Sequence, residues 1–226
     1  MNLVDLALGK PYCLVLNIKQ HTGAAAMEPS PSNFKYRILV VDDNVSMRQT
    51  LPTLLSGNGY EVHTAVDGFD ALNALRWAVP DLIISDLTMP NMSGFEFLSV
   101  VRRRFPNVPV IALSGEFTGV SMPSGVLADA FFSKGEHSAE QFFRKITELL
   151  DHPPIRSKYE LAPLWIPRTT TGYHVLTCTE CLRSFQVPDQ PVDGKLREDE
   201  CIFCGTKVRY RVESATSTSS PSAATA

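Results

Sequence analysis

Short apolar runs that end in polar or acidic residues recur through the first two thirds of this 226-residue chain. Two of them are 37–43, RILVVDD, and 81–86, DLIISD. An apolar run without alternation is typical of a parallel strand that is buried on both faces. Stretches with helical spacing of apolar residues follow these runs. The chain therefore predicts a doubly wound α/β fold over 37–150, with a five-stranded parallel sheet covered by helices on both faces.

The remaining segments differ from this region in composition. We expect 1–36 to be a disordered leader. Its apolar N-terminal stretch lacks the basic residues of a signal sequence and is interrupted by glycine and proline, and Met27 is an alternative translation start. Residues 151–172 carry four prolines and predict a stiff linker. We expect 173–213 to form a small β domain, and the low-complexity tail 214–226 to be disordered.

Net charge and hydropathy limit the classes of protein to which this chain can belong. The net charge is -3, which gives no reason to expect a polyanionic partner such as nucleic acid. No apolar run approaches the roughly 20 residues that a membrane helix needs. We therefore expect a cytoplasmic protein that does not bind membranes.

Polar residues follow the predicted strands at the points where those strands end: Asp42, Asp43, Asp86, Ser114 and Lys134. The carboxyl ends of parallel strands meet at one edge of a sheet, so these side chains should lie together. Three close carboxylates need a cation, and oxygen ligands suit Mg²⁺. Asp86 can then act as a nucleophile that forms an acyl phosphate, while Lys134 and Ser114 contact the phosphoryl oxygens. A lone acid would more simply cap a helix, but five matching residues favour phosphoryl transfer.

Four motifs carry a resemblance to a known family. They are ILVVDDN at 38–44, DLIISDLTMPNMSGFEFL at 81–98, VIALSG at 110–115 and AFFSK at 130–134. In order and separation they resemble the receiver domain of bacterial two-component response regulators. The resemblance covers 37–150.

The resemblance implies a role for each matching residue. Asp86 would accept a phosphoryl group from a sensor histidine kinase or a phosphotransfer protein. Asp42, Asp43, Asp86 and the backbone carbonyl of Thr88 would hold Mg²⁺. The implied phosphoryl-binding and switch residues are Ser114, Lys134 and Phe131. The only chemistry implied is self-phosphorylation from a donor and later hydrolysis, so we do not expect a stand-alone enzyme.

The chain departs from the family pattern at three places. Gly135 stands where the family has a proline after the lysine. Pro52 falls inside the first helical pattern and predicts a kink. Glycine and proline in 117–128 predict a short or irregular fourth helix.

The cysteines form a second constellation, with the pattern C-x2-C-x19-C-x2-C at Cys178, Cys181, Cys201 and Cys204. Without an export signal, this spacing predicts one tetrahedral Zn²⁺ site in a module that resembles a zinc ribbon. A closed four-thiolate site favours a structural metal over a catalytic one. An iron site with the same ligands and a redox dithiol are the weaker alternatives. Six basic and seven acidic residues between 173 and 213 do not favour a phosphate clamp.

Taken together, these patterns predict a response regulator that signals to an unknown output protein through a protein-interaction ribbon. Two alternatives remain open. In one the ribbon binds nucleic acid, and in the other the chain is a phosphorelay intermediate whose ribbon is purely structural.

Overall fold

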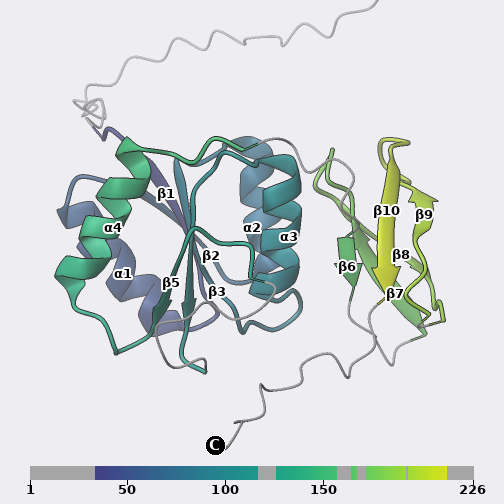
Figure 1. Ribbon diagram of the computed structural model, residues 1–226, viewed down its shortest axis with the longest axis horizontal. Coiled ribbons are helices and arrows are strands. Elements are labelled where there is room, and N and C mark those ends of the chain that lie inside the picture. Colours follow the sequence, from purple (N-terminus) through teal and green to yellow (C-terminus); the bar gives the residue numbers. More distant parts are fainter. Residues whose placement is uncertain (1–33, 117–125, 157–163, 167–171, 192, 213–226) are drawn as a thin grey trace, which may run out of the picture. The chain divides into compact units, whose positions relative to one another are not determined.

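A computed structural model describes most of the chain (Figure 1). The described ranges are 34–116, 126–156, 164–166, 172–191 and 193–212. Most of the expected leader, of the irregular 117–128 segment and of the C-terminal tail therefore lies outside the described residues. Within the described ranges, no helix is long and apolar enough to cross a bilayer.

Five parallel strands form the central sheet. They are β1 (Arg37–Val41), β2 (Glu61–Ala65), β3 (Leu82–Asp86), β4 (Val110–Ser114) and β5 (Ala130–Ser133). Their order is β2-β1-β3-β4-β5, and every neighbouring pair is parallel. The predicted five-stranded α/β sheet is thus confirmed. The order reverses between β1 and β3, which is where an open sheet of this kind binds its ligands.

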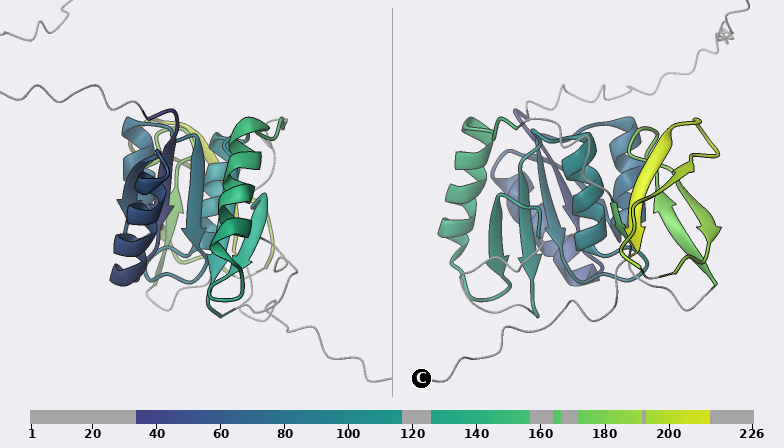
Figure 2. Two further views of the ribbon diagram at one scale, coloured as in Figure 1. Left: turned by 90° about the vertical axis from the view of Figure 1, so that its left-hand side faces the viewer. Right: turned by 45° about the vertical axis from the view of Figure 1, so that its right-hand side comes forward.

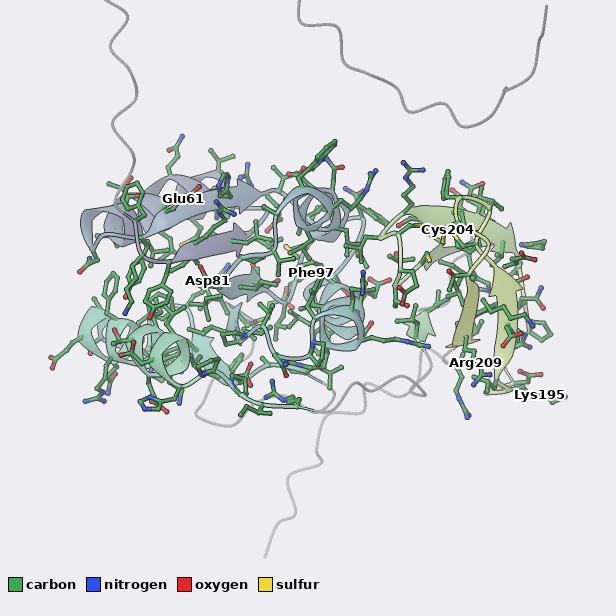
Figure 3. The ribbon with its side chains drawn as sticks, turned by 90° about the horizontal axis from the view of Figure 1, so that it is seen from above. Glu61, Asp81, Phe97, Lys195, Cys204 and Arg209 are labelled. Atoms are coloured by element: carbon green, nitrogen blue, oxygen red, sulfur yellow. The ribbon has the colours of Figure 1, made fainter. Side chains whose placement is uncertain are left out.

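Helices cover both faces of this sheet (Figures 1 and 2). They are α1 (Val45–Gly57), α2 (Gly68–Trp77), α3 (Gly94–Arg104) and α4 (Ala139–Asp151). Apolar side chains of α1 and α4 pack with Ile38, Val40 and other residues on one face of the strands. Those of α2 and α3 pack with Leu39, Val41 and others on the opposite face. Phe97 of α3, labelled in Figure 3, is fully buried in the second cluster.

Side-chain caps fix where all four helices begin, and at α2 the cap is the Asp67 carboxylate, which accepts from the Asp70 N–H at 2.9 Å. Ser93 caps α3 in a reciprocal box, in which its backbone N–H donates to the Glu96 carboxylate at 2.9 Å. Ser138 forms the same kind of box with Gln141 at the start of α4. Asn44 caps α1, and its side-chain oxygen accepts from the backbone N–H of Ser46 at 2.9 Å. These bonds satisfy N–H groups that have no partner inside the helix.

Two departures from the family pattern have clear local consequences. Pro52 lies within α1, which continues to Gly57 although proline cannot supply a backbone N–H. Gly135 has a φ of 89°, a left-handed conformation that glycine adopts at little cost.

The C-terminal region forms two small sheets. One contains β6 (Leu164–Ile166), β10 (Lys207–Val212) and β9 (Arg197–Glu200) in that order; the other pairs β7 (Tyr173–Thr177) with β8 (Ser184–Pro188). Tyr210 of β10 is fully buried, and its hydroxyl donates to Asp199 at 2.6 Å. The expectation of a linker over the whole of 151–172 needs an amendment, because Leu164–Ile166 pair in parallel with β10. The apolar side chains of Leu164 and Ile166 are also buried.

Candidate functional site

Three carboxylates lie together at the carboxyl ends of β1 and β3. One oxygen from each of Asp42, Asp43 and Asp86 lies within 4.8 Å of the others. Asp42 is 1% exposed and Asp86 is 5% exposed, whereas Asp43 faces solvent. The sheet therefore brings together the acids that the sequence predicted, two of them buried and one open to an incoming ligand.

Lys134 is the principal counter-charge among the described residues of this cluster. Its Nζ lies 2.8 Å from Asp42 Oδ2 and 2.5 Å from Asp86 Oδ2. Burial alone would lower the pKa of Lys134, but its hydrogen bonds to the two carboxylates outweigh burial and raise that pKa. Burial also raises the pKa of Asp86, and Lys134 offsets only part of this rise. The two rises in pKa are compatible. Two carboxylates favour the charged form of Lys134, whereas one shared ammonium group cannot replace the water that Asp86 has lost on burial.

The loops after β3 and β4 add hydrogen-bond donors and a fourth acid, Glu116. The backbone N–H of Thr88 donates to Asp86 Oδ1 at 3.3 Å, which places the Thr88 backbone beside the acids. The Thr88 hydroxyl donates to Glu116 Oε2 at 3.1 Å, and the Glu116 N–H donates to Ser114 Oγ at 3.2 Å. Sequence reasoning missed Glu116, because its contact with Thr88 depends on two loops that are far apart in the chain.

Residues on both sides of the cluster position it further. Arg48 of α1 donates from Nη1 to the backbone carbonyl of Asp42 at 2.7 Å, a contact that the sequence did not suggest. Phe131 of β5 is partly buried and pairs in register with Ala112. Ser114 is fully buried at the end of β4, and its carbonyl accepts from the Lys134 N–H at 2.7 Å.

Comparison with known proteins assigns this part of the chain to a family. Residues 38–133 match the response regulator receiver domain. These residues are a receiver domain of the two-component response regulators. The match includes every acid of the cluster, together with Ser114 and Phe131, and ends just before Lys134.

Several curated proteins share this receiver domain. The protein-glutamate methylesterase/protein-glutamine glutaminase 1 of Anaeromyxobacter dehalogenans is 46% identical over 79 residues, which are 35% of this chain and 22% of that protein. Protein PilG of Pseudomonas aeruginosa is 37% identical over 82 residues, 35% of this chain and 61% of PilG. The DNA-binding response regulator MtrA of Mycobacterium leprae is 35% identical over 96 residues, 42% of each chain. The chain thus spans less than two thirds of the length of each of these relatives.

Solved receiver structures are also similar. The chemotaxis response regulator CheY4 of Vibrio cholerae is 34% identical, with a TM-score of 0.46, over 50% of this chain and 97% of that one. The response regulator TrrA of Thermotoga maritima, solved in complex with Mg(2+)-BeF, is 32% identical over the same shares, also with a TM-score of 0.46.

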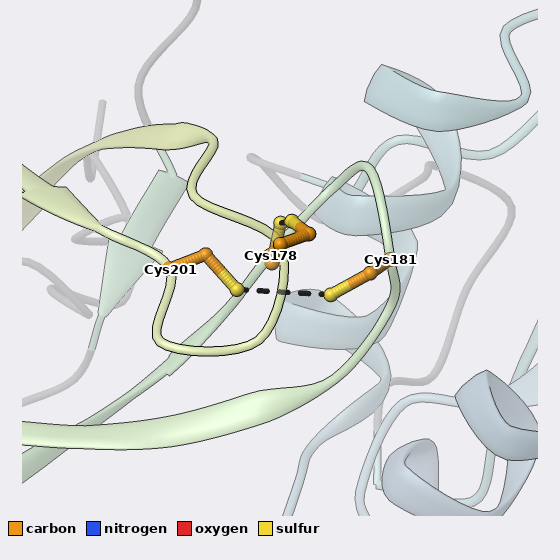
Figure 4. A group of neighbouring side chains, drawn as sticks. Cys178, Cys181 and Cys201 are labelled. Atoms are coloured by element: carbon orange, nitrogen blue, oxygen red, sulfur yellow. Dashed lines mark hydrogen bonds between the residues drawn. The ribbon is translucent and has the colours of Figure 1, made fainter. Parts of the chain in front are cut away.

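The four C-terminal cysteines converge on one point (Figure 4). The sulfurs of Cys178 and Cys204 are 3.6 Å apart, and those of Cys181 and Cys201 are 3.7 Å apart. A disulfide would bring the sulfurs to about 2 Å. Four thiolates at the usual Zn–S length of about 2.3 Å stand about 3.8 Å from one another in a tetrahedron. The observed spacing therefore fits a shared metal ion better than a disulfide.

The environments of these thiols differ from one another. Cys178 and Cys201 are buried, whereas Cys204 is exposed. Burial raises the pKa of Cys178 to about 12. Hydrogen bonds from Thr206 lower the pKa of Cys204 to about 6. A metal ion held by these four cysteines would remove such differences in pKa, because it would deprotonate every thiol that coordinates it.

Proposed function

We propose that this chain is a response regulator that accepts a phosphoryl group on Asp86 from a histidine kinase or a phosphotransfer protein. The observation that carries the proposal is the cluster of three acids with Lys134, within a receiver domain whose members are typically phosphoacceptors rather than stand-alone enzymes. Phosphoryl transfer forms a bond between an Asp86 oxygen and phosphorus. The bond from phosphorus to the donor, an imidazole nitrogen or an acyl oxygen, breaks at the same time.

The residues present fit a magnesium site. Asp42, Asp43 and Asp86 offer carboxylate oxygens, and the position of the Thr88 N–H beside Asp86 supports a role for the Thr88 carbonyl as a fourth ligand. Bound Mg²⁺ would neutralise charge on the phosphoryl oxygens during transfer. The chain itself supplies Lys134 as a fixed positive charge and the Ser114 hydroxyl as a donor to those oxygens.

A change at Asp86 tests the phosphoacceptor. Asp86→Asn keeps the size of the side chain but removes the nucleophilic oxygen. Incubation with acetyl phosphate and Mg²⁺ should therefore give no phosphoprotein by intact mass spectrometry. Asp70→Asn is a matched control, because Asp70 is an exposed carboxylate in the first turn of α2. Equal labelling of Asp86→Asn and the native chain would sink the proposal.

For the C-terminal region, we propose that 173–213 form a zinc ribbon whose Zn²⁺ is held by the four cysteines and is structural. The sulfur spacing and the four free thiols support this proposal over a disulfide pair. Two small sheets have too little core to be stable alone, so metal binding would supply much of their folding free energy. Iron remains an alternative, because it takes the same four ligands.

Metal content tests the ribbon. Purified protein should hold about one equivalent of zinc by mass spectrometry, since one four-thiolate site binds one ion. Cys201→Ser should lose the metal and deprotect β7 and β10 in hydrogen exchange, while labelling of Asp86 continues. Cys13→Ser removes the one cysteine outside the quartet and should keep the zinc. Native protein that is folded, metal-free and fully reduced would contradict the ribbon.

We propose a protein, rather than nucleic acid, as the output partner of the ribbon. Two of its basic side chains are already paired, since Lys207 Nζ and Arg209 Nε lie 2.9 and 3.1 Å from the Glu198 carboxylate. Paired cations are poor phosphate ligands. DNA or RNA binding that weakens steeply with salt would favour the alternative of a nucleic-acid-binding regulator.

A further inference from the structure

An ion cluster joins the residues after α4 to the start of β5. Asp129 directly precedes β5, and its carboxylate lies between the guanidinium groups of Arg102 in α3 and Arg156 beyond α4. The side chains of Arg102 and Asp129 are each 5% exposed, whereas that of Arg156 is 24% exposed. The cluster is therefore buried on its inner side and open to water on its outer side.

The inner side of the cluster is held by many bonds. Asp129 Oδ2 accepts from Arg102 Nη2 at 3.1 Å and from the Val110 N–H at 2.8 Å. Arg102 also donates to the backbone carbonyls of Leu127 at 2.8 Å and Pro106 at 3.1 Å. Breaking a buried ion pair with this many bonds is strongly unfavourable, so Arg102 and Asp129 should move as one body.

The outer side of the cluster fixes the first residues of the predicted linker. The Arg156 N–H donates to Asn107 Oδ1 at 2.9 Å, and the Arg156 side chain bonds to Asp129 Oδ1 and to the Pro106 carbonyl. Asp129 already has a full counter-charge in Arg102, and Arg156 is partly in water. The contact of Arg156 is thus the weaker of the two, and a shift of Asp129 would break it first.

β5 connects this contact to the candidate phosphorylation site. The strand has only four residues, with Asp129 immediately before it and Lys134 immediately after it. Lys134 now bonds to Asp42 and Asp86, and a phosphoryl group on Asp86 would compete for its ammonium group. Because β5 is short and continuous, a displacement of Lys134 and Phe131 would also shift Asp129 at its other end.

We propose that Arg156, Asp129 and Asn107 form a latch that docks the start of the linker on the receiver domain, and that phosphorylation of Asp86 opens it. The linker leads to the proposed ribbon, so the latch gives the receiver domain a route to its output module through the chain itself. This inference rests on the proposed function, because it needs a phosphoryl group on Asp86.

Hydrogen exchange of the full chain tests the latch, with beryllofluoride and Mg²⁺ as the phosphoryl mimic. The Arg156 amide is protected by its bond to Asn107, and opening of the latch should make its exchange roughly tenfold faster. Arg156→Gln and Asn107→Ala should exchange rapidly there with or without the mimic. Arg144→Gln, which removes an exposed arginine of α4 instead, should respond like the native chain.

Amides of 86–89 report mimic binding independently of the latch. Protection at 86–89 together with faster exchange at Arg156 supports the latch. Protection at 86–89 with unchanged or slower exchange at Arg156 overturns the latch and leaves the proposed function standing. No protection at 86–89 overturns the proposed function and the latch with it. Retention of the native response in Arg156→Gln would also overturn the latch.

Discussion

Gly94, the first residue of α3, lies unusually close to the backbone of the phosphoacceptor segment. A Cβ atom at Gly94 would stand 2.1 Å from the carbonyl oxygen of Asp86 and 2.7 Å from Leu87 Cα. Both neighbours are backbone atoms, so no side chain can turn aside to make room. The Gly94 N–H also donates to the Leu87 carbonyl at 3.0 Å, which holds the two segments together.

The change Gly94→Ala should therefore be costly in both stability and activity. Backbone atoms would have to shift by about 1 Å, and overpacking of this kind costs about 1–3 kcal/mol, at times more. The better helix propensity of alanine returns at most about 1 kcal/mol. We expect a net loss of about 2 kcal/mol in the free energy of unfolding, measured by urea denaturation at constant m. Because the shift moves Asp86, labelling by acetyl phosphate should also become several-fold slower.

Gly57→Ala serves as the matched control for this prediction. Gly57 is the last residue of α1, and a Cβ there meets no atom within 4 Å. This change should leave labelling unaltered and stabilise the chain by up to about 1 kcal/mol. The reasoning fails if Gly94→Ala unfolds at the same urea concentration as the native chain and is labelled at the native rate.

Two further predictions concern single side chains. Lys134→Met removes the ammonium group that two buried carboxylates share, and should lower the free energy of unfolding in EDTA by about 3 kcal/mol. Added Mg²⁺ should restore part of this loss, as measured by the urea midpoint with and without Mg²⁺. Equal midpoints for the native chain and the variant in EDTA would contradict the prediction. Ser93→Ala removes the cap of α3 and should cost about 1 kcal/mol in thermal unfolding, whereas Ser99→Ala, within the same helix, should cost less.

The sequence predicted most of the receiver domain because its signals are local. Each apolar run sets a buried strand, and the polar residue at its end is carried to one edge of the sheet by the parallel topology alone. Asp42, Asp86 and Lys134 therefore come together as expected, even though 92 positions separate the first and last of them. The contact between Thr88 and Glu116 was beyond such reasoning, since it depends on the conformation of two loops.

The C-terminal strands show the opposite case. β9 has the sequence REDE, and charged residues such as these have low strand propensity. The strand nevertheless pairs with β10, where Arg209 forms an ion pair with Glu198. β6 has three residues in a proline-rich segment and pairs with a strand some 45 positions further on. Neither β6 nor β9 has a local sequence pattern that predicts a strand, because each forms only by pairing with β10, a strand later in the chain.

The position of β6 also bears on how the C-terminal region could be produced as a fragment. β10 lies between β6 and β9, and its Val208, Tyr210 and Val212 side chains are buried. A fragment that began at 173 would turn β10 into an edge strand, with free N–H and carbonyl groups beside apolar side chains. Such an edge invites pairing between chains and aggregation. A soluble fragment should therefore begin before Leu164, inside what composition alone would discard as linker.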